Sequence, residues 1–378
     1  MSLRIVLITS EFPPDIGGIA SHVDELARGL VLEGQNVKVV YARSLVSTCA
    51  KQEARGVVVQ RPRVFMGEPL YQVMLRSWLS RSLSHAPADI LHVHGMRPVG
   101  ATRGLSVPTV FTNHTSGFLN RLRASPYRQK RTMRLLEHVS YLIGPSAELV
   151  EGARALGYRG PAAMIANGVD VDRFRPGDAA MRASLGIGPD DVAVLLARRL
   201  VDKNGVVWFA RAVAQLRHLP IRVIIAGDGP ERTTMHAILR ESGMLERTVF
   251  LGAVANKDMP AVYRAGDLSV LPSLAEATSI SGLEAMASGL PLVGTQVGGI
   301  PAIIDDGVTG FLVPARDSDA MALAVGKLVA DRDLRRRFGA EARSKVKREF
   351  AWPIIVRRTM EVYGLCAEAS RRSGSELA

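Results

Sequence analysis

The chain has only two cysteines, Cys49 and Cys366, among 378 residues. They lie far apart and belong to no Cys or Cys/His motif, which argues against a disulfide framework and a cysteine-based metal site and is typical of a reducing cytoplasm. No run of eighteen apolar residues occurs, so the sequence predicts no membrane-spanning helix. The start, MSLRIVLITSEFPPD, has one Arg and a short apolar run, which predicts a buried first strand rather than a signal peptide.

Aromatic residues are also scarce, at 5% of the chain, whereas basic residues are abundant and give a formal net charge of +12. Residues 1–170 hold 20 Lys and Arg against 12 Asp and Glu, and the remainder holds 28 against 24. The basic first half indicates an anionic partner. Because aromatics are too scarce to be interleaved regularly with the basic residues, we expect no nucleic-acid partner.

Short apolar runs alternate with helical patterns along both halves of the chain. The first half contains LRIVLIT, VKVVYA, DILHVHG and PTVFTNH, and the second contains VAVLLA, IRVIIAG, LSVLPS and PLVGT. Near-continuous apolar strands separated by helices predict parallel sheets covered on both faces. The fold class is therefore α/β, with two doubly wound parallel-sheet domains of the Rossmann type.

A turn-rich segment, NGVDVDRFRPGD, separates the two halves. We expect a first domain over residues 1–168, a second domain over 169–352, and a C-terminal helix over 353–378 that returns to the first domain. Ligands bind beyond the carboxyl ends of the strands in such sheets, which predicts a site in a central cleft that both domains face.

One strand, loop and helix carries the strongest chemical signal, LPSLAEATSISGLEAMASGLPLVGT. Glu276 lies in the loop, and Glu284 lies in the first turns of the helix. The loop amides of Thr278, Ser279 and Ile280 point toward a helix N-terminal anion site, which suits a diphosphate. Carboxylates accept pairs of hydroxyl hydrogen bonds, which suits sugar and ribose diols. Without the preceding strand and loop, two Glu at this spacing would be interpreted as ordinary helix residues.

Four motifs together resemble glycosyltransferase family 4, which has the GT-B fold. They are EFPPDIGGIASHVDELARGL, NGVDVDRFRP, AGDGPER and the run from FLGAV to GFLVP, and they cover nearly the whole chain in the family's order. The resemblance implies a retaining transfer from a nucleotide sugar, with the acceptor bound by the domain over residues 1–168 and the donor by the domain over 169–352. It implies that Glu276 holds the donor sugar, that Glu284 holds the ribose, and that the backbone of Val254 contacts the base. The family often has Gly where this chain has Ala277.

Two cations follow a predicted strand in ARRLVDKNG. Fixed cations there would stabilise charge on the leaving diphosphate without a metal. The resemblance assigns this role to Arg199 and Lys203. Many relatives have the Lys one residue later, at the position of Asn204, and a solvated basic loop is the alternative.

Two further sites are expected in the first domain. The pair Gly17 and Gly18 lies between the first strand and the first helix, where backbone amides can approach a ligand closely; a plain tight turn is the alternative. The resemblance places this loop over the donor phosphates. It also places His114, at the end of a strand, close to the reacting sugar, where it hydrogen-bonds a hydroxyl or orients the acceptor. A structural histidine is the alternative.

No metal or other cofactor is expected. His92 and His94 face the same side of one strand, but the sequence shows no third ligand beside them. The acidic pairs Asp170/Asp172 and Asp317/Asp319 fit turn and helix-capping roles.

The segment from Arg121 to Arg134 has six basic and no acidic residues, and from Ser125 it predicts an amphipathic helix. It suits an anionic membrane surface that carries a lipid-linked acceptor, and an ordinary solvated helix face is the alternative. The basic residues are Arg121, Arg123, Arg128, Lys130, Arg131 and Arg134.

The predicted function is a metal-independent retaining glycosyltransferase with a UDP- or GDP-sugar donor and a glycan or lipid-linked acceptor. We expect it in the cytoplasm, peripheral to the membrane, in the synthesis of cell-surface polysaccharide, lipopolysaccharide or glycolipid. The alternatives are a nucleotide-sugar epimerase on the same fold, which would need acid/base groups for elimination, and a non-catalytic sugar-nucleotide-binding protein.

Overall fold

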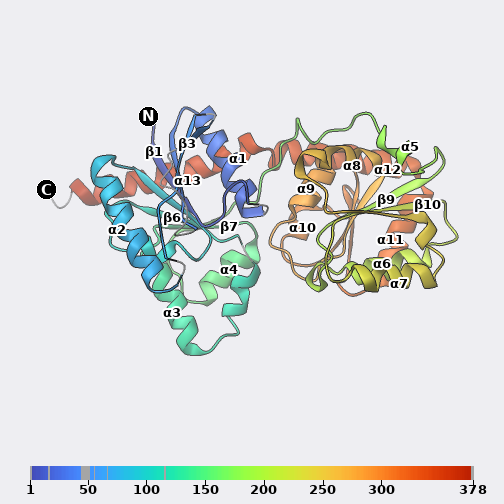
Figure 1. Cartoon of the computed structure of the whole chain (residues 1–378), viewed down its shortest axis with the longest axis horizontal. Helices are drawn as coiled ribbons and strands as arrows, with labels where there is room; N and C mark the ends of the chain where they lie inside the picture. Colours follow the sequence, from blue (N-terminus) through green and yellow to red (C-terminus); the bar gives the residue numbers. More distant parts are fainter. Residues whose placement is uncertain are drawn as a thin grey trace. The chain divides into compact units, whose positions relative to one another are not determined.

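The computed structural model of the protein describes residues 2–15, 18–43, 52–54, 56–65, 67–114 and 116–375. The chain forms two compact units (Figure 1). Unit 1 consists of residues 1–167 and 352–378, and unit 2 consists of residues 168–351. The last helix therefore belongs to the same unit as the N-terminal strands.

Unit 1 contains an eight-stranded sheet in the order β3-β4-β2-β1-β5-β6-β7-β8. All neighbouring strands pair in parallel except β3, which pairs antiparallel with β4 at the edge. The strands are β1 (Arg4–Thr9), β2 (Asn36–Tyr41), β3 (Gln52–Ala54), β4 (Val57–Gln60), β5 (Ile90–His94), β6 (Thr109–Thr112), β7 (Tyr141–Gly144) and β8 (Ala162–Met164). The order reverses direction at β1, as in a doubly wound sheet.

Helices cover both faces of this sheet. They are α1 (Gly18–Leu32), α2 (Leu70–His85), α3 (Pro126–Leu136), α4 (Ala147–Ala155) and α13 (Trp352–Ser375), with the 3-10 turns η1 (Val99–Thr102) and η2 (Ser116–Arg121). On one face, α1 and α13 pack side by side over alternate strand residues such as Leu7 and Val39. On the other face, Lys38 of β2 donates to Ser82 of α2. The buried residues Ile355 and Tyr363 make α13 part of the unit 1 core.

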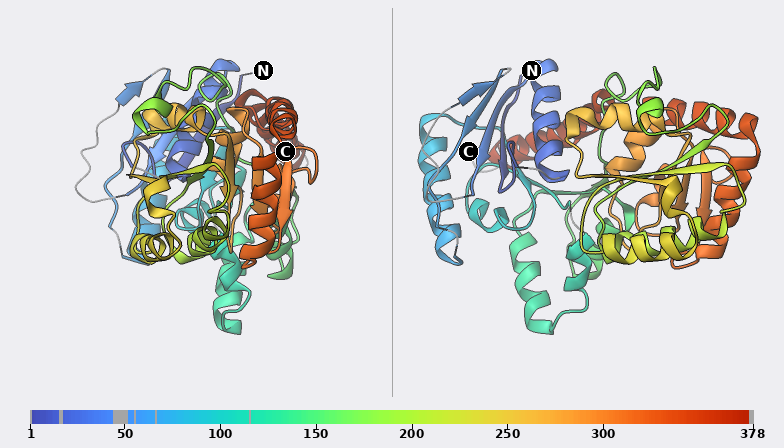
Figure 2. Two further views of the ribbon diagram at one scale, coloured as in Figure 1. Left: turned by 90° about the vertical axis from the view of Figure 1, so that its right-hand side faces the viewer. Right: turned by 45° about the vertical axis from the view of Figure 1, so that its right-hand side comes forward.

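Unit 2 contains a six-stranded, entirely parallel sheet in the order β11-β10-β9-β12-β13-β14. The strands are β9 (Val192–Ala197), β10 (Ile221–Ala226), β11 (Thr248–Gly252), β12 (Leu268–Leu271), β13 (Leu292–Thr295) and β14 (Gly310–Val313). Every residue of β9 and β12 is buried, because helices lie on both sides of the sheet (Figure 2).

The helices of unit 2 form two layers. The elements are α5 (Met181–Ser184), η3 (Asp202–Asn204), α6 (Val206–Gln215), α7 (Arg232–Glu241), η4 (Leu245–Arg247), η5 (Asn256–Asp258), α8 (Met259–Ala265), α9 (Ile280–Ala287), α10 (Ile300–Ile303), α11 (Ser318–Ala330) and α12 (Arg332–Glu349). α6, α7 and α11 share one face and bury Phe209, Leu239 and Val325. α9 packs between α8 and α12.

The predicted fold class is confirmed, with two α/β units built on parallel sheets and a C-terminal helix in the first. The antiparallel edge strand β3 was not predicted, because three residues that include Gln52 and Glu53 carry no strand signal. Within the described ranges, no helix is both long enough and apolar enough to cross a membrane.

Candidate functional site

Two loops of unit 2 meet at the carboxyl ends of the neighbouring strands β9 and β12. The first loop spans residues 198–205 and the second spans residues 272–279. The backbone amide of Leu274 donates to the carbonyl of Lys203 over 2.8 Å. Because parallel neighbours end at the same edge of the sheet, both loops lie where α/β folds bind ligands.

Gly205 allows these loops to approach each other. Its φ is +65°, in the left-handed region. A Cβ atom built there would lie 1.7 Å from the carbonyl oxygen of Pro272, which belongs to the second loop. A side chain at this position would therefore push the two loops apart.

Arg198 joins the two loops through its guanidinium group. Its side chain is 8% exposed and forms an ion pair with Glu276, whose side chain is 17% exposed. It also donates to the hydroxyl of Ser279 over 3.1 Å and to the side-chain oxygen of Asn204 over 3.3 Å. Asn204 in turn donates to the carbonyl of Arg199 over 2.8 Å. The carboxylate of Glu276 is thus held in one position before any ligand arrives.

The N-terminus of α9 begins beside this ion pair. Ser279 is the N-cap, and its hydroxyl accepts from the amide of Gly282 over 3.2 Å. The helix begins at Ile280, one of the two starts that the sequence indicates, Ile280 or Ser281. Thr278 and Ser279 are buried. The amides at a helix start and the nearby Arg198 guanidinium favour an anion in this corner of the unit.

Glu284 lies one turn into α9 and is 8% exposed. Its carboxylate accepts a hydrogen bond of 2.8 Å from the hydroxyl of Tyr263, on α8. Burial raises the pKa of Glu284 to about 7, and the Tyr263 hydrogen bond and the charge of Arg173 oppose that rise. A carboxylate poised near neutral pH is stabilised by any ligand that donates hydroxyl hydrogen bonds to it.

The structure places the other predicted donor contacts at the same edge of the unit 2 sheet. Arg199 directly follows Arg198 and is exposed, and Lys203 is exposed in η3. Val254 is half-buried in the loop after β11. The side chains of Arg199 and Lys203 make no hydrogen bond or ion pair with any part of the chain that the structure describes, so both are available to a ligand.

Sequence reasoning missed Arg198 and Asn204. Arg198 is adjacent to the predicted Arg199, and nothing in the local sequence tells which of the two guanidinium groups turns inward. Asn204 stands where many relatives have Lys, but its role in holding Arg198 depends on a contact between two loops. The inward position of Arg198 and the role of Asn204 could therefore not be predicted from the sequence.

The predicted residues of unit 1 lie near the first helix and two strand ends. Gly18 is the first residue of α1. Gly17, its predicted partner, lies outside the described residues. His114 follows β6 and is half-buried.

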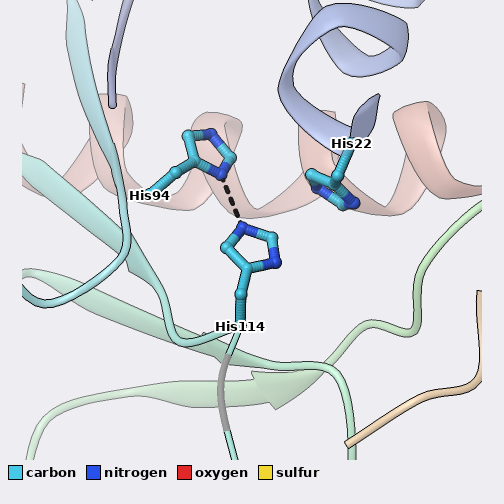
Figure 3. Close-up of side chains that lie close together, drawn as sticks. All are labelled: His22, His94 and His114. Carbon is cyan, nitrogen blue, oxygen red and sulfur yellow. Dashed lines mark hydrogen bonds between the residues drawn. The ribbon is translucent and has the colours of Figure 1, made fainter. Parts of the chain in front are cut away.

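His114 belongs to a cluster with His22 of α1 and His94, the last residue of β5 (Figure 3). The Nδ1 atom of His94 and the Nε2 atom of His114 are 2.9 Å apart. Burial lowers the pKa of His22 to about 4 and holds the pKa values of His94 and His114 well below the usual range. All three imidazoles are therefore neutral at pH 7.

The hydrogen bond between His94 and His114 selects a tautomer. Nε2 of His94 is buried and has no partner among the described residues. A buried unpaired N–H costs more than a buried bare acceptor. His94 therefore carries its proton on Nδ1 and donates to His114, which leaves the proton of His114 on Nδ1. Figure 3 shows that second nitrogen of His114 turned away from His94.

The cluster changes one expectation from the sequence, that no third ligand lies near His92 and His94. Ring nitrogens of His22, His94 and His114 all lie within 4.8 Å of one another, and such a set could hold a metal ion. His92 instead bonds Tyr363 over 2.6 Å and Thr112 over 2.7 Å. The sequence could not show the convergence because the three histidines come from three separate elements. Metal independence stays a prediction.

The two acidic pairs have the predicted structural roles. The Asp170 carboxylate accepts from the amides of Asp172 and Arg173 in a turn. The Asp317 carboxylate accepts from the amides of Asp319 and Ala320 and caps α11.

The basic segment forms the predicted helix, α3, from Pro126 to Leu136. The predicted core-facing residues are Met133, Leu135, Leu136 and Val139, of which Leu136 and Val139 are buried and Met133 and Leu135 are half-buried. The outward residues include Arg128, Lys130, Arg131 and Arg134, all exposed, together with Tyr127 at 76% exposure.

Two family models match successive parts of the chain. Residues 16–173 match the model described as Glycosyltransferase Family 4. Residues 178–345 match the model described as Glycosyl transferases group 1. The two matches meet close to the junction between the units.

Similar proteins of known or assigned activity agree with these models. An uncharacterized glycosyltransferase of Methanocaldococcus jannaschii is 27% identical over 98% of this chain and 100% of its own length. A GDP-mannose-dependent alpha-(1-6)-phosphatidylinositol monomannoside mannosyltransferase of Mycobacterium tuberculosis is 27% identical over 93% of this chain and 96% of its own. A D-inositol 3-phosphate glycosyltransferase of Nocardia farcinica is 35% identical over 52% of this chain and 46% of its own.

Solved structures share the fold over almost the whole chain. A sucrose-phosphate synthase from Thermosynechococcus elongatus superposes with a TM-score of 0.83 at 21% identity and covers 97% of this chain and 100% of its own. HepE of Anabaena in complex with UDP-glucose superposes with a TM-score of 0.78 at 20% identity and covers 96% of this chain and 99% of its own.

Proposed function

The chain belongs to glycosyltransferase family 4, a family of retaining hexosyltransferases that use nucleotide sugars, and from this membership we propose the particular reaction it catalyses. It moves a hexosyl group from a UDP- or GDP-sugar to a glycan or lipid-linked acceptor. This reaction serves the synthesis of cell-surface polysaccharide, lipopolysaccharide or glycolipid. The relatives that use GDP-mannose or bind UDP-glucose support this choice of donors.

The observation that carries the proposal is the arrangement around α9. Glu276 is held by Arg198 and receives the hydroxyls of the donor sugar. The 278–280 amides face the diphosphate, and Glu284 accepts the ribose diol. The family resemblance suggests these separate roles, and the two carboxylates do differ in surroundings, since Glu284 is enclosed with Tyr263 whereas Glu276 lies in the loop.

The leaving diphosphate gains negative charge as the sugar departs. The exposed cations Arg199 and Lys203 stabilise that charge, and Arg198 adds a third positive group that is already fixed. The leaving phosphate oxygen takes the proton of the attacking hydroxyl on the same face of the sugar, which gives retention. This route needs no protein nucleophile and no metal.

Unit 1 supplies the acceptor contacts in this proposal. His114 donates its Nδ1 proton to a substrate oxygen, because its Nε2 atom is occupied by His94. The basic face of α3, with the exposed Tyr127, meets an anionic membrane surface.

A thermal-shift panel of UDP-, GDP- and ADP-sugars tests the donor assignment, because a ligand that binds the folded state raises the melting temperature. We expect one UDP- or GDP-sugar to raise it selectively. Equal response to all nucleotides, or to none, would contradict the proposal.

A further inference from the structure

Unit 1 has a second candidate site, apart from the histidine cluster. A cavity of about 920 Å³ lies among α2, η2, α3 and the turn before η1. Four arginines line it, namely Arg97, Arg121, Arg128 and Arg131. A cavity of this size has room for a phosphate together with the polyol or sugar that bears it.

The described lining of this cavity holds more basic than acidic side chains. Its one carboxylate among the described residues, Glu68, accepts a 2.9 Å hydrogen bond from the side-chain amide of Gln72. Within the described ranges, Arg121, Arg128 and Arg131 have no carboxylate within 4 Å. Among the residues that the structure describes, Arg121 donates a hydrogen bond to the hydroxyl of Thr132, over 3.2 Å.

Burial and the neighbouring charge of Arg131 both lower the pKa of Arg121. Like charges that share a partly enclosed space repel each other, and a bound anion removes that cost. Guanidinium groups remain protonated and present a planar fork that matches phosphate oxygens.

The rest of the lining fixes the shape of the cavity. Gln72 also donates to the carbonyl of Arg97 over 2.6 Å, and the Arg97 guanidinium lies 4.4 Å from the centre of the Tyr71 ring. The side-chain oxygen of Gln72 is buried without a partner among the described residues.

We propose that this cavity binds a phosphate ester. Resting on the proposed glycosyl transfer, the phosphate belongs to the acceptor and not to the nucleotide. The guanidinium groups hold the phosphate and leave the hydroxyls beside it to be glycosylated. The phosphate ester comes either from a soluble compound or from a lipid headgroup.

The chain offers a matched pair of variants for the test. Arg128→Ser/Arg131→Ser removes two exposed guanidinium groups that line the cavity. Arg76→Ser/Arg81→Ser removes two exposed guanidinium groups of α2 that do not line it and do not belong to the basic segment. Both variants lose the same net charge and leave the buried residues unchanged.

Two arms identify the source of the phosphate. Glycerol 3-phosphate is titrated by calorimetry, with and without saturating nucleoside diphosphate, so that the donor site is accounted for. Vesicles of phosphatidylglycerol and phosphatidylcholine are compared with pure phosphatidylcholine in a pelleting assay. We expect the cavity variant to lose at least about tenfold in affinity in one arm or both, and the matched variant to stay within about twofold.

Loss in the calorimetric arm identifies a soluble ester, and loss in the vesicle arm alone identifies a headgroup. Equal loss in both variants would show general attraction to basic charge and would overturn the proposal. Absence of binding by the unaltered protein in both arms would overturn it as well. Neither result depends on nucleotide-sugar binding, so failure of the proposed function is detected separately by the thermal-shift panel.

Discussion

In unit 2, Arg198 is buried against Glu276 and Ser279, and Glu284 is enclosed with Tyr263. In unit 1, Arg121, Arg128 and Arg131 line a cavity in which the one carboxylate among the described residues, that of Glu68, accepts a hydrogen bond from an amide. The first region is organised by its own opposite charges, whereas the second is left with positive charge. The difference indicates that the buried contacts of unit 2 hold Glu276 and Glu284 in place before a ligand binds, whereas the cavity of unit 1 gains stability when an anion binds.

The largest expected effect on the transfer rate comes from removing the carboxylate of Glu276 in unit 2. Glu276→Ala should lower the transfer rate by about a thousandfold, because the donor sugar loses the group that orients it. Nucleoside diphosphate binding should remain, as measured by thermal shift. Glu276→Gln keeps an acceptor for Arg198 and should retain the melting temperature of the unaltered protein. Unaltered activity in Glu276→Ala would remove Glu276 from the site.

The next largest effects distinguish the roles of Arg198 and Arg199, through turnover and the free energy of unfolding. Arg199→Ala should lower turnover by about a hundredfold with little change in stability, since its side chain is exposed and acts on the leaving group. Arg198→Ala should also destabilise the fold, by about 3 kcal/mol, because it leaves Glu276 without its partner. Urea unfolding and steady-state kinetics measure the two quantities. If Arg199→Ala turns over normally, the leaving-group role passes to Arg198 and Lys203.

A smaller effect follows from the titration of Glu284, whose pKa is raised to about 7 in the folded protein from 4.5. The resulting cost to stability is absent below about pH 4.5 and complete above about pH 7, because folding disfavours the ionised form. A ribose diol binds the ionised form better, so nucleotide affinity should fall about tenfold from pH 8 to pH 6. Calorimetry of nucleoside diphosphate against pH checks this. Glu284→Gln should flatten the profile, and an unchanged profile in that variant would exclude Glu284 as the cause.

Loss of the hydrogen bond between His94 and His114 in unit 1 should have a still smaller effect on turnover. His94→Leu should lower turnover about fivefold, because the proton of His114 is no longer held on Nδ1. A fivefold loss corresponds to the free energy of about one hydrogen bond. Nitrogen chemical shifts of His114 report the tautomer directly. In a His114→Leu background, the further change His94→Leu should have no effect on turnover. A full additional loss there would mean that His94 acts independently of His114.

The smallest expected effect is that of metal removal. Dialysis against a chelator should leave the transfer rate within about twofold, because cations of the chain serve the leaving diphosphate. The rate is compared before and after dialysis, with Zn²⁺ and Mg²⁺ restored as a control. A large loss that Zn²⁺ restores would show that the histidine cluster holds a required metal.

Much of this account was available from the sequence. Alternation of apolar runs and helices indicated both sheets, and the small, hydroxylated loop before Ile280 indicated the start of α9. Local patterns failed where partners lie far apart in the chain. Arg198 meets Glu276 across 78 positions, and His22 joins His94 and His114 from a separate helix. The arginine cavity escaped notice for the same reason, since Arg97 and Arg131 meet only in the folded unit.

Hydrogen–deuterium exchange with the nucleotide sugar selected by the thermal-shift panel tests the central claim most directly. The account predicts slower exchange in residues 198–205 and 276–284 of unit 2, and unchanged exchange in residues 121–134 of unit 1. Slower exchange confined to residues 121–134, with none at the start of α9, would contradict it.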